Sequence, residues 1–458
     1  MGANPASNVY SKSHRRGEPG PVTSHPGGGH GVRLGLLTAG LLAALLAVAV
    51  VGPDPQQPEL VTLGAGGPAR PAALQSQPVS AVGARDFEQL LGHHVFLMAR
   101  SMRSRALNRP ESDHAFEDAL VSNTEQLSTA IGSLYGEQHT APFRQAWYSH
   151  VFLLNDYATG VATGDTALRD NAKSGLEQYR TQYGAFVESM TAGAIPSTTA
   201  AENLRAHLDH LTAHIDAYVA GDFATAFAGH REAYAHMFPT AAALVSGAAA
   251  PIPGELPTPP GDPSEQLRSR LSMLLGEHYE LAVDLTRSGL TGAADFTAVA
   301  ESLNANTRDL TAAFDSLFGV ESATAFNQLW ASHIDLVVRY TVAVAQGDTA
   351  GQQAAMAELA QHSRALGTTF SDLTAGAVPA DGAVALLSVH DDHLVQQVNA
   401  YAATDYATAH QLSFDGYNHM YDTAEALAAG IETGLASNLP VGGVQTGGGG
   451  PWASAHDH

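Results

Sequence analysis

Cysteine is absent from this chain of 458 residues. No disulfide can form, and the Cys-x-x-Cys-His motif that attaches haem covalently is excluded. A chain without cysteine suits an exported protein that avoids thiol oxidation, although it is also compatible with the cytoplasm. The compartment must therefore be inferred from the N-terminal sequence.

Positive charge is scarce. Lys and Arg number 22 against 45 Asp and Glu, which gives a formal net charge of −23. This excess of negative charge repels phosphate backbones, and no basic stripe interrupts it. The sequence therefore predicts that nucleic acid is not a partner.

Several catalytic motifs are also missing. The chain has no His-Glu-x-x-His, no phosphate-binding glycine loop and no Gly-x-Ser-x-Gly. Glu111-x-x-His114 has the spacing found in di-iron bundles, but it has no second copy, and we expect it to be solvated. Because nothing identifies a nucleophile or an acid–base pair, the sequence does not predict an enzyme.

One apolar run is long enough to cross a bilayer. Leu34 to Val51 spans 18 residues, and cations including Arg33 precede it. This pattern predicts a single-pass protein of the cell membrane, with residues 1–33 in the cytoplasm and the C-terminal part outside. Ala47-Val48-Ala49 is a small-residue pattern that a signal peptidase could use, so cleavage, which would make the protein secreted, remains the alternative to an anchor.

Composition divides the rest of the chain. Residues 52–83 are rich in Pro and Gly and predict a spacer, residues 249–263 form a Pro-rich linker, and residues 438–458 form a Gly-rich tail that we expect to be disordered. The two long segments between them, 84–248 and 264–437, are the predicted folded domains.

These two segments repeat one another. The stretch from Phe143 to Leu154 returns 183 positions later as Phe326 to Val337, with Phe, Gln, Trp, Ser and His at the same places. The same offset aligns further short motifs along both segments. One unit is therefore expected to be used twice.

Apolar residues in both segments recur at spacings of three and four, which predicts helices throughout. Gly-Asp pairs, such as Gly164-Asp165, Gly221-Asp222 and Gly347-Asp348, predict tight corners, with Gly in a left-handed conformation and Asp as the next N-cap. The predicted fold class is all-α, with two tandem, homologous up-down helical bundles after the membrane segment. In the first segment the predicted helices lie near 84–107, 112–134, 139–163, 166–191, 198–220 and 222–247.

Histidine is abundant, and five histidines recur between the segments, four at the 183-residue offset and His94 as His278 after one inserted residue. A buried neutral imidazole needs partners for its nitrogens, and bundles build metal and haem sites from such side chains on facing helices. We therefore predict a site in each segment for a transition metal such as copper or zinc, or for haem. The predicted ligands are His94, His150, His207 and His210 in the first segment, and His278, His333, His390 and His393 in the second.

The alternative is a structural network, in a non-catalytic protein of the cell envelope that displays surface to partners. In this interpretation the histidines bond to residues that also recur, namely Asn123/Asn306, Asp209/Asp392 or Tyr234/Tyr417. The fifth recurring pair, His236 and His419, falls off the apolar helix face and is expected nearer the surface.

The order of short motifs in each segment resembles small exported bacterial helical-bundle proteins of unassigned role, which have a single copy of the unit. The matching residues are Tyr135-Gly136, His150-Val151, His210-Leu211 and Tyr234-Ala-His236-Met237, with Phe318-Gly319, His333-Ile334, His393-Leu394 and Tyr417-Asn-His419-Met420. The resemblance implies an exported helical bundle and implies no activity.

Overall fold

The computed structural model describes residues 83–248 and 263–437, and the predicted membrane segment at 34–51 lies outside these ranges. Within them every regular element is helical, so the all-α prediction is confirmed. None of the helices in the described ranges is long and apolar enough to span a membrane.

The described helices fall into two sets of six. The first set is α2 (Ala84–Ala106), α3 (Pro110–Tyr135), α4 (Thr140–Thr163), α5 (Thr166–Met190), α6 (Ser197–Val219) and α7 (Phe223–Ala248), with a short 3₁₀ turn, η1 (Glu137–His139). The second is α8 (Pro263–Thr291), α9 (Phe296–Phe318), α10 (Val320–Gln346), α11 (Thr349–Leu373), α12 (Ala380–Ala402) and α13 (Tyr406–Ser437). The predicted boundaries of the first set agree with these to within two residues.

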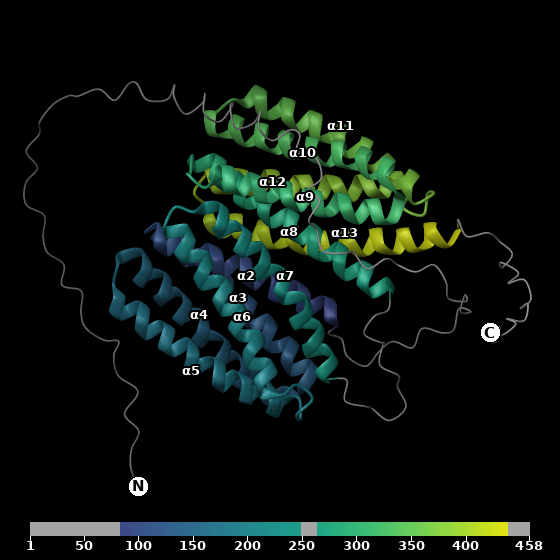
Figure 1. Ribbon diagram of the computed structural model, residues 1–458. Helices are drawn as coiled ribbons and strands as arrows, with labels where there is room; N and C mark the ends of the chain where they lie inside the picture. Colours follow the sequence, from purple (N-terminus) through teal and green to yellow (C-terminus); the bar gives the residue numbers. More distant parts are fainter. Residues whose placement is uncertain (1–82, 249–262, 438–458) are drawn as a thin grey trace, which may run out of the picture. The chain divides into compact units, whose positions relative to one another are not determined.

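The Gly-Asp pairs form the corners that their chemistry predicts. Gly164 has φ +71° and Gly347 has φ +68°, a region that glycine enters without steric cost. The following aspartates cap the next helix, because Asp165 accepts from the Leu168 amide and Asp348 from the Gly351 amide, each at 3.0 Å. Each corner reverses the chain, so consecutive helices pack against one another (Figure 1).

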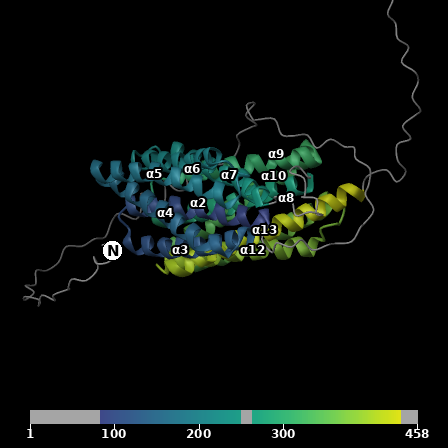
Figure 2. The same cartoon turned by 90° about the horizontal axis from the view of Figure 1, so that it is seen from below.

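One helix lies at the centre of each set. Helix α2 packs on α3, α4, α6 and α7, and α8 packs on α9, α10, α12 and α13. Both central helices also contact the opposite set of helices. The two sets meet again where α3 lies beside α13 (Figure 2). Side chains from Leu91 to Ser104 are consequently all buried, as are nearly all from Leu271 to Ser288.

A single hydrophobic core runs through both sets. At its centre the hydroxyl oxygens of Tyr234 and Tyr417, which are equivalent positions of the two segments, lie 3.3 Å apart. A Cβ added to Gly92 would lie 2.5 Å from the Tyr417 hydroxyl, and one added to Gly276 would lie 2.7 Å from the Tyr234 hydroxyl. Such reciprocal contacts are typical of a self-complementary, two-fold interface. That residues 84–248 and 264–437 are separate domains stays a prediction.

Buried ion pairs join α2 to α8. Asp284 accepts from Arg100 Nε at 2.9 Å and from Arg103 Nη2 at 2.8 Å, and Glu280 Oε2 lies 2.6 Å from Arg100 Nη1. Both carboxylates are 0% exposed. Burial alone would raise the pKa of Asp284, but Arg100, Arg103 and Arg287 outweigh it and hold that pKa far below its ordinary value.

We expect Asp284→Ala to destabilise the protein by about 3–5 kcal/mol, because it removes the buried carboxylate that pairs with Arg103 and leaves Arg100 with Glu280 alone. Urea unfolding of the full chain measures this change. The matched control is Glu358→Ala, which removes an ion pair with Arg339 in which both side chains are about half exposed; little change is expected there. Equal effects of the two substitutions would contradict the role assigned to the buried network.

A second prediction concerns Glu88 of α2, whose carboxylate accepts from Ser269 of α8 at 2.7 Å. Burial raises its pKa to about 7. The folded state therefore holds this proton more tightly than the unfolded chain, so the group's contribution to stability is complete below about pH 4 and is lost as the pH rises through about 7. Glu88→Gln should remove that loss, which unfolding at pH 5 and pH 8 would detect; an unchanged pH dependence would refute the assignment.

Candidate metal centres

Three buried histidines from three helices converge in the first set. His94 comes from α2, His150 from α4 and His207 from α6, and one ring nitrogen of each lies within 4.8 Å of the other two. Their exposed fractions are 0%, 0% and 2%. The convergence arises because α2, α4 and α6 pack mutually, so that the inward stripe of each helix meets the other two.

The second set repeats this cluster. His278 of α8, His333 of α10 and His390 of α12 also have one nitrogen each within 4.8 Å of the others. In both clusters the first two histidines approach through their Nε2 atoms at 3.1 Å, His94 to His150 and His278 to His333. We refer to the two groups of three as the inner clusters.

Groups behind the inner clusters orient the rings. Nδ1 of His333 donates to the carbonyl oxygen of Trp330, the residue one turn earlier. In the first cluster Nδ1 of His150 has no such partner among the described residues, and burial lowers the pKa of this ring. The His333 ring is thereby held with Nδ1 protonated and with the Nε2 lone pair directed into the cluster.

Recurring asparagines act on the first histidine of each cluster. Asn306 donates its amide protons to the Leu274 carbonyl and to Glu277, which leaves its amide oxygen as acceptor. Burial and the neighbouring His333 and His390 lower the pKa of His278, and the adjacent Asn306 amide opposes this. Asn123, which donates to the Leu90 carbonyl, acts on His94 in the same way.

This arrangement leaves several ring nitrogens without hydrogen-bond partners. One Nε2–H can bridge each pair of Nε2 atoms at 3.1 Å, but Nδ1 of His94, His150 and His278 has no partner among the described residues. Neither nitrogen of His207 or of His390 has a hydrogen-bond partner among the described residues. A buried polar atom left in this state costs about 1–3 kcal/mol. A shared proton satisfies one pair of nitrogens, whereas a cation satisfies three.

Electrostatics keeps all six rings neutral. Burial lowers the pKa of each, to about 3 for His333 and well below the ordinary value for the other five. A neutral imidazole has the lone pair that metal coordination requires. The nitrogen spacing also suits a metal: two bonds of about 2.0–2.1 Å at tetrahedral angles place their nitrogens about 3.3 Å apart. Only the third histidine needs to move inward.

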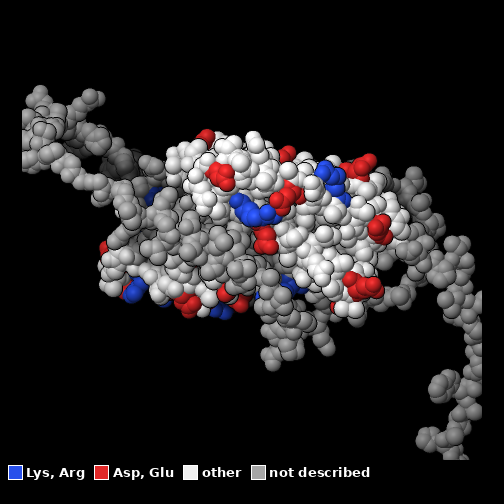
Figure 3. All heavy atoms as spheres, turned by 90° about the horizontal axis from the view of Figure 1, so that it is seen from above, with Lys and Arg blue, Asp and Glu red and all other residues white. Residues whose placement is uncertain are grey.

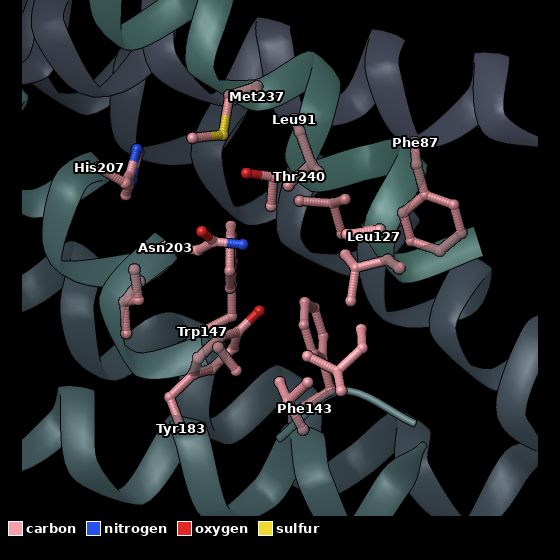
Figure 4. Close-up of a pocket in the computed structure, with 16 residues that line it drawn as sticks. Phe87, Leu91, Leu127, Phe143, Trp147, Tyr183, Asn203, His207, Met237 and Thr240 are labelled. Carbon is pink, nitrogen blue, oxygen red and sulfur yellow. The ribbon is translucent and has the colours of Figure 1, made fainter. Parts of the chain in front are cut away.

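A small apolar cavity adjoins the first inner cluster. It has a volume of about 40 Å³, and His207, Trp147, Tyr183 and Met237 are among its lining residues (Figure 4). This space holds a few water molecules. It therefore offers room for a further small ligand beside His207, but not for the porphyrin ring of haem.

Not all of the predicted ligands enter the inner clusters. His210 and His393, predicted to share an ion with His207 and His390, lie outside them and are half-buried. The i,i+3 spacing places both rings on one side of the helix, but the second ring faces the α6–α7 or α12–α13 seam, where it lies 6.1 Å from the next histidine ring. That the eight predicted residues bind metal stays a prediction.

Of the predicted network partners, only the asparagines lie beside the rings of the inner clusters in the described ranges. Asp209 pairs with Arg205, and Tyr234 bonds to Tyr417. The sequence did not predict a tryptophan carbonyl as a hydrogen-bond partner of these histidines. The repeated Trp-x-x-His spacing was the one feature of the sequence that could have indicated it. His362 beside His333 was also missed, because its counterpart in the first segment is Tyr179, which stacks on His150. No family model, curated protein or solved structure matches this chain.

Proposed function

We propose that this protein binds transition-metal ions, one in each inner cluster. His94, His150 and His207 are the ligands in the first, and His278, His333 and His390 in the second. The observation that carries the proposal is the convergence, in both clusters, of three buried imidazoles whose nitrogens lie within 4.8 Å of one another.

The unpartnered third histidine favours metal binding over a purely structural network. A network that fixes helix register would bond its members, whereas His207 and His390 have no hydrogen bond at either nitrogen among the described residues. Unlike the equally unpartnered His230, each of them lies in a group of three histidines. A cation supplies the missing partner for all three rings at once. The Asn and Trp groups behind the rings are the supports that metal-bound histidines commonly have.

The donor set points to copper or zinc. Imidazole nitrogen suits both ions, and three histidines leave a fourth position open on a tetrahedral metal. No carboxylate belongs to either inner cluster. A divalent ion there would therefore be neutralised best by a small anionic fourth ligand, whereas a monovalent ion would bring less charge to neutralise. The 40 Å³ cavity beside His207 provides space for such a ligand.

We further propose that the chain is a tandem duplication of one exported helical-bundle unit, held outside the cytoplasm by residues 34–51. The 183-residue offset supports the duplication, and the cations before the apolar run support the topology. Its described surface fits binding of small cations better than binding of nucleic acid, because Lys and Arg lie among Asp and Glu on the face in Figure 3.

The stoichiometry tests the proposal. Wild-type protein purified without a His tag should bind two equivalents of copper or zinc in calorimetric titration and elemental analysis. His150→Ala should lose the first equivalent and keep the second, and His333→Ala should do the reverse, because each removes one of three ligands.

The matched control is His230→Ala. His230 is also buried in the first set, has no partner at either nitrogen among the described residues and lies outside the inner clusters. This variant should keep both equivalents even if it unfolds more readily. Absence of saturable binding to the wild type at micromolar metal would end the proposal.

The supporting asparagines should tune affinity without setting stoichiometry. Asn306→Ala removes the group that orients His278, so we expect metal affinity of the second cluster to fall about 10–100-fold. Competition with a chelator of known affinity measures this change. Asn327→Ala is the control, because Asn327 accepts from Thr311 instead. An unaltered affinity in Asn306→Ala would show that the asparagine does not support the site.

A further inference from the structure

Two of the five recurring histidine pairs are not used by the inner clusters. His210 on α6 and His236 on α7 have their ring centroids 6.1 Å apart, and so do His393 on α12 and His419 on α13. The same two-histidine arrangement therefore forms twice, in both cases on the seam between the last two helices of a set.

A carboxylate accompanies each of these pairs. Oε2 of Glu232 lies 3.7 Å from Nδ1 of His210. Asp415 occupies the equivalent position in the second set, 183 residues later, where it accepts from Gln411 at 2.9 Å. Burial lowers the pKa of His393, and the charge of Asp415 opposes this. Two imidazoles and a carboxylate are ordinary ligands of divalent transition metals.

One ring of each pair is already oriented. Nε2 of His236 donates to the Asn203 carbonyl at 3.0 Å, and Nε2 of His419 donates to the Leu386 carbonyl at 2.8 Å. In the neutral ring this leaves Nδ1 with a free lone pair. The accepting carbonyl lies one turn before the buried His207 or His390, so the oriented ring sits beside the inner cluster.

These groups are accessible, unlike the inner histidines. The side chain of His210 is 30% exposed and that of Glu232 is 70% exposed, whereas His207 is 2% exposed. His207 and His210 are three residues apart, which places their side chains on neighbouring turns of one helix face. A chain of ligands therefore runs from solvent to the inner cluster.

We propose that His210, Glu232 and His236, and likewise His393, Asp415 and His419, form outer sites that capture a metal ion from solvent and pass it to the inner cluster. This inference rests on the proposed function. A site enclosed in a helical core needs an entry path, and a net charge of −23 concentrates cations at the protein surface. Transfer proceeds by ligand exchange, in which His207 replaces His210 on the ion, and no electron is transferred.

The test follows zinc uptake by metal-free, full-length protein against a chromophoric chelator. The variant His210→Ala/His236→Ala/His393→Ala/His419→Ala should still bind two equivalents at equilibrium, but it should load more slowly by about tenfold or more. Glu232→Gln/Asp415→Asn, which preserves side-chain shape, should also load more slowly. The control His139→Ala, whose ring contacts Phe186, should load at the wild-type rate.

The outcomes separate this inference from the function on which it rests. Loading of both outer-site variants at the wild-type rate, with two equivalents bound, would overturn the outer sites and leave the inner centres standing. Loss of bound zinc in the outer-site variants, with retention in His150→Ala and His333→Ala, would overturn the inner centres and the transfer step together. Absence of zinc binding by the wild type would overturn both proposals.

Discussion

Burial of α2 and α8 on every side is the constraint on which the rest of the structure depends. Each helix packs against four helices of its own set and also against the opposite set. The polar residues in the middle of both helices, within 91–104 and 271–288, are buried from water and need partners inside the protein. Arg100 of α2 finds Asp284 of α8, and the first histidine of each inner cluster, His94 or His278, lies on the same two helices.

The two kinds of buried polar group are satisfied differently. The arginines and carboxylates between α2 and α8 neutralise one another's charge. The inner clusters contain only neutral imidazoles, and several of their ring nitrogens have no hydrogen-bond partner among the described residues. This difference in chemistry is why the ion-pair network is assigned to stability and the histidine clusters to binding.

The two sets of helices also differ in the residues that surround the inner-cluster histidines. In the second set Asn306 is tied through Glu277 to Arg231, which belongs to α7 of the first set, whereas Asn123 donates to a carbonyl of α2. His362 lies against His333, where the first set has Tyr179. The second cluster is therefore linked to the interface between the sets, and the two centres need not have equal affinity.

Sequence alone determined the helices and their corners, because apolar spacing and Gly-Asp pairs are local signals that act within one or two turns. It also identified His94, His150 and His207, with their counterparts, since recurrence at an offset of 183 positions, or 184 for His94, needs no structure. Only the tertiary structure decided which histidines meet. Helical spacing joined His210 to His207, but the packing of α7 against α6 turned His210 toward His236, while α2 and α4 brought His94 and His150 to His207. That choice depends on contacts between residues up to 113 positions apart along the chain, which no local pattern encodes.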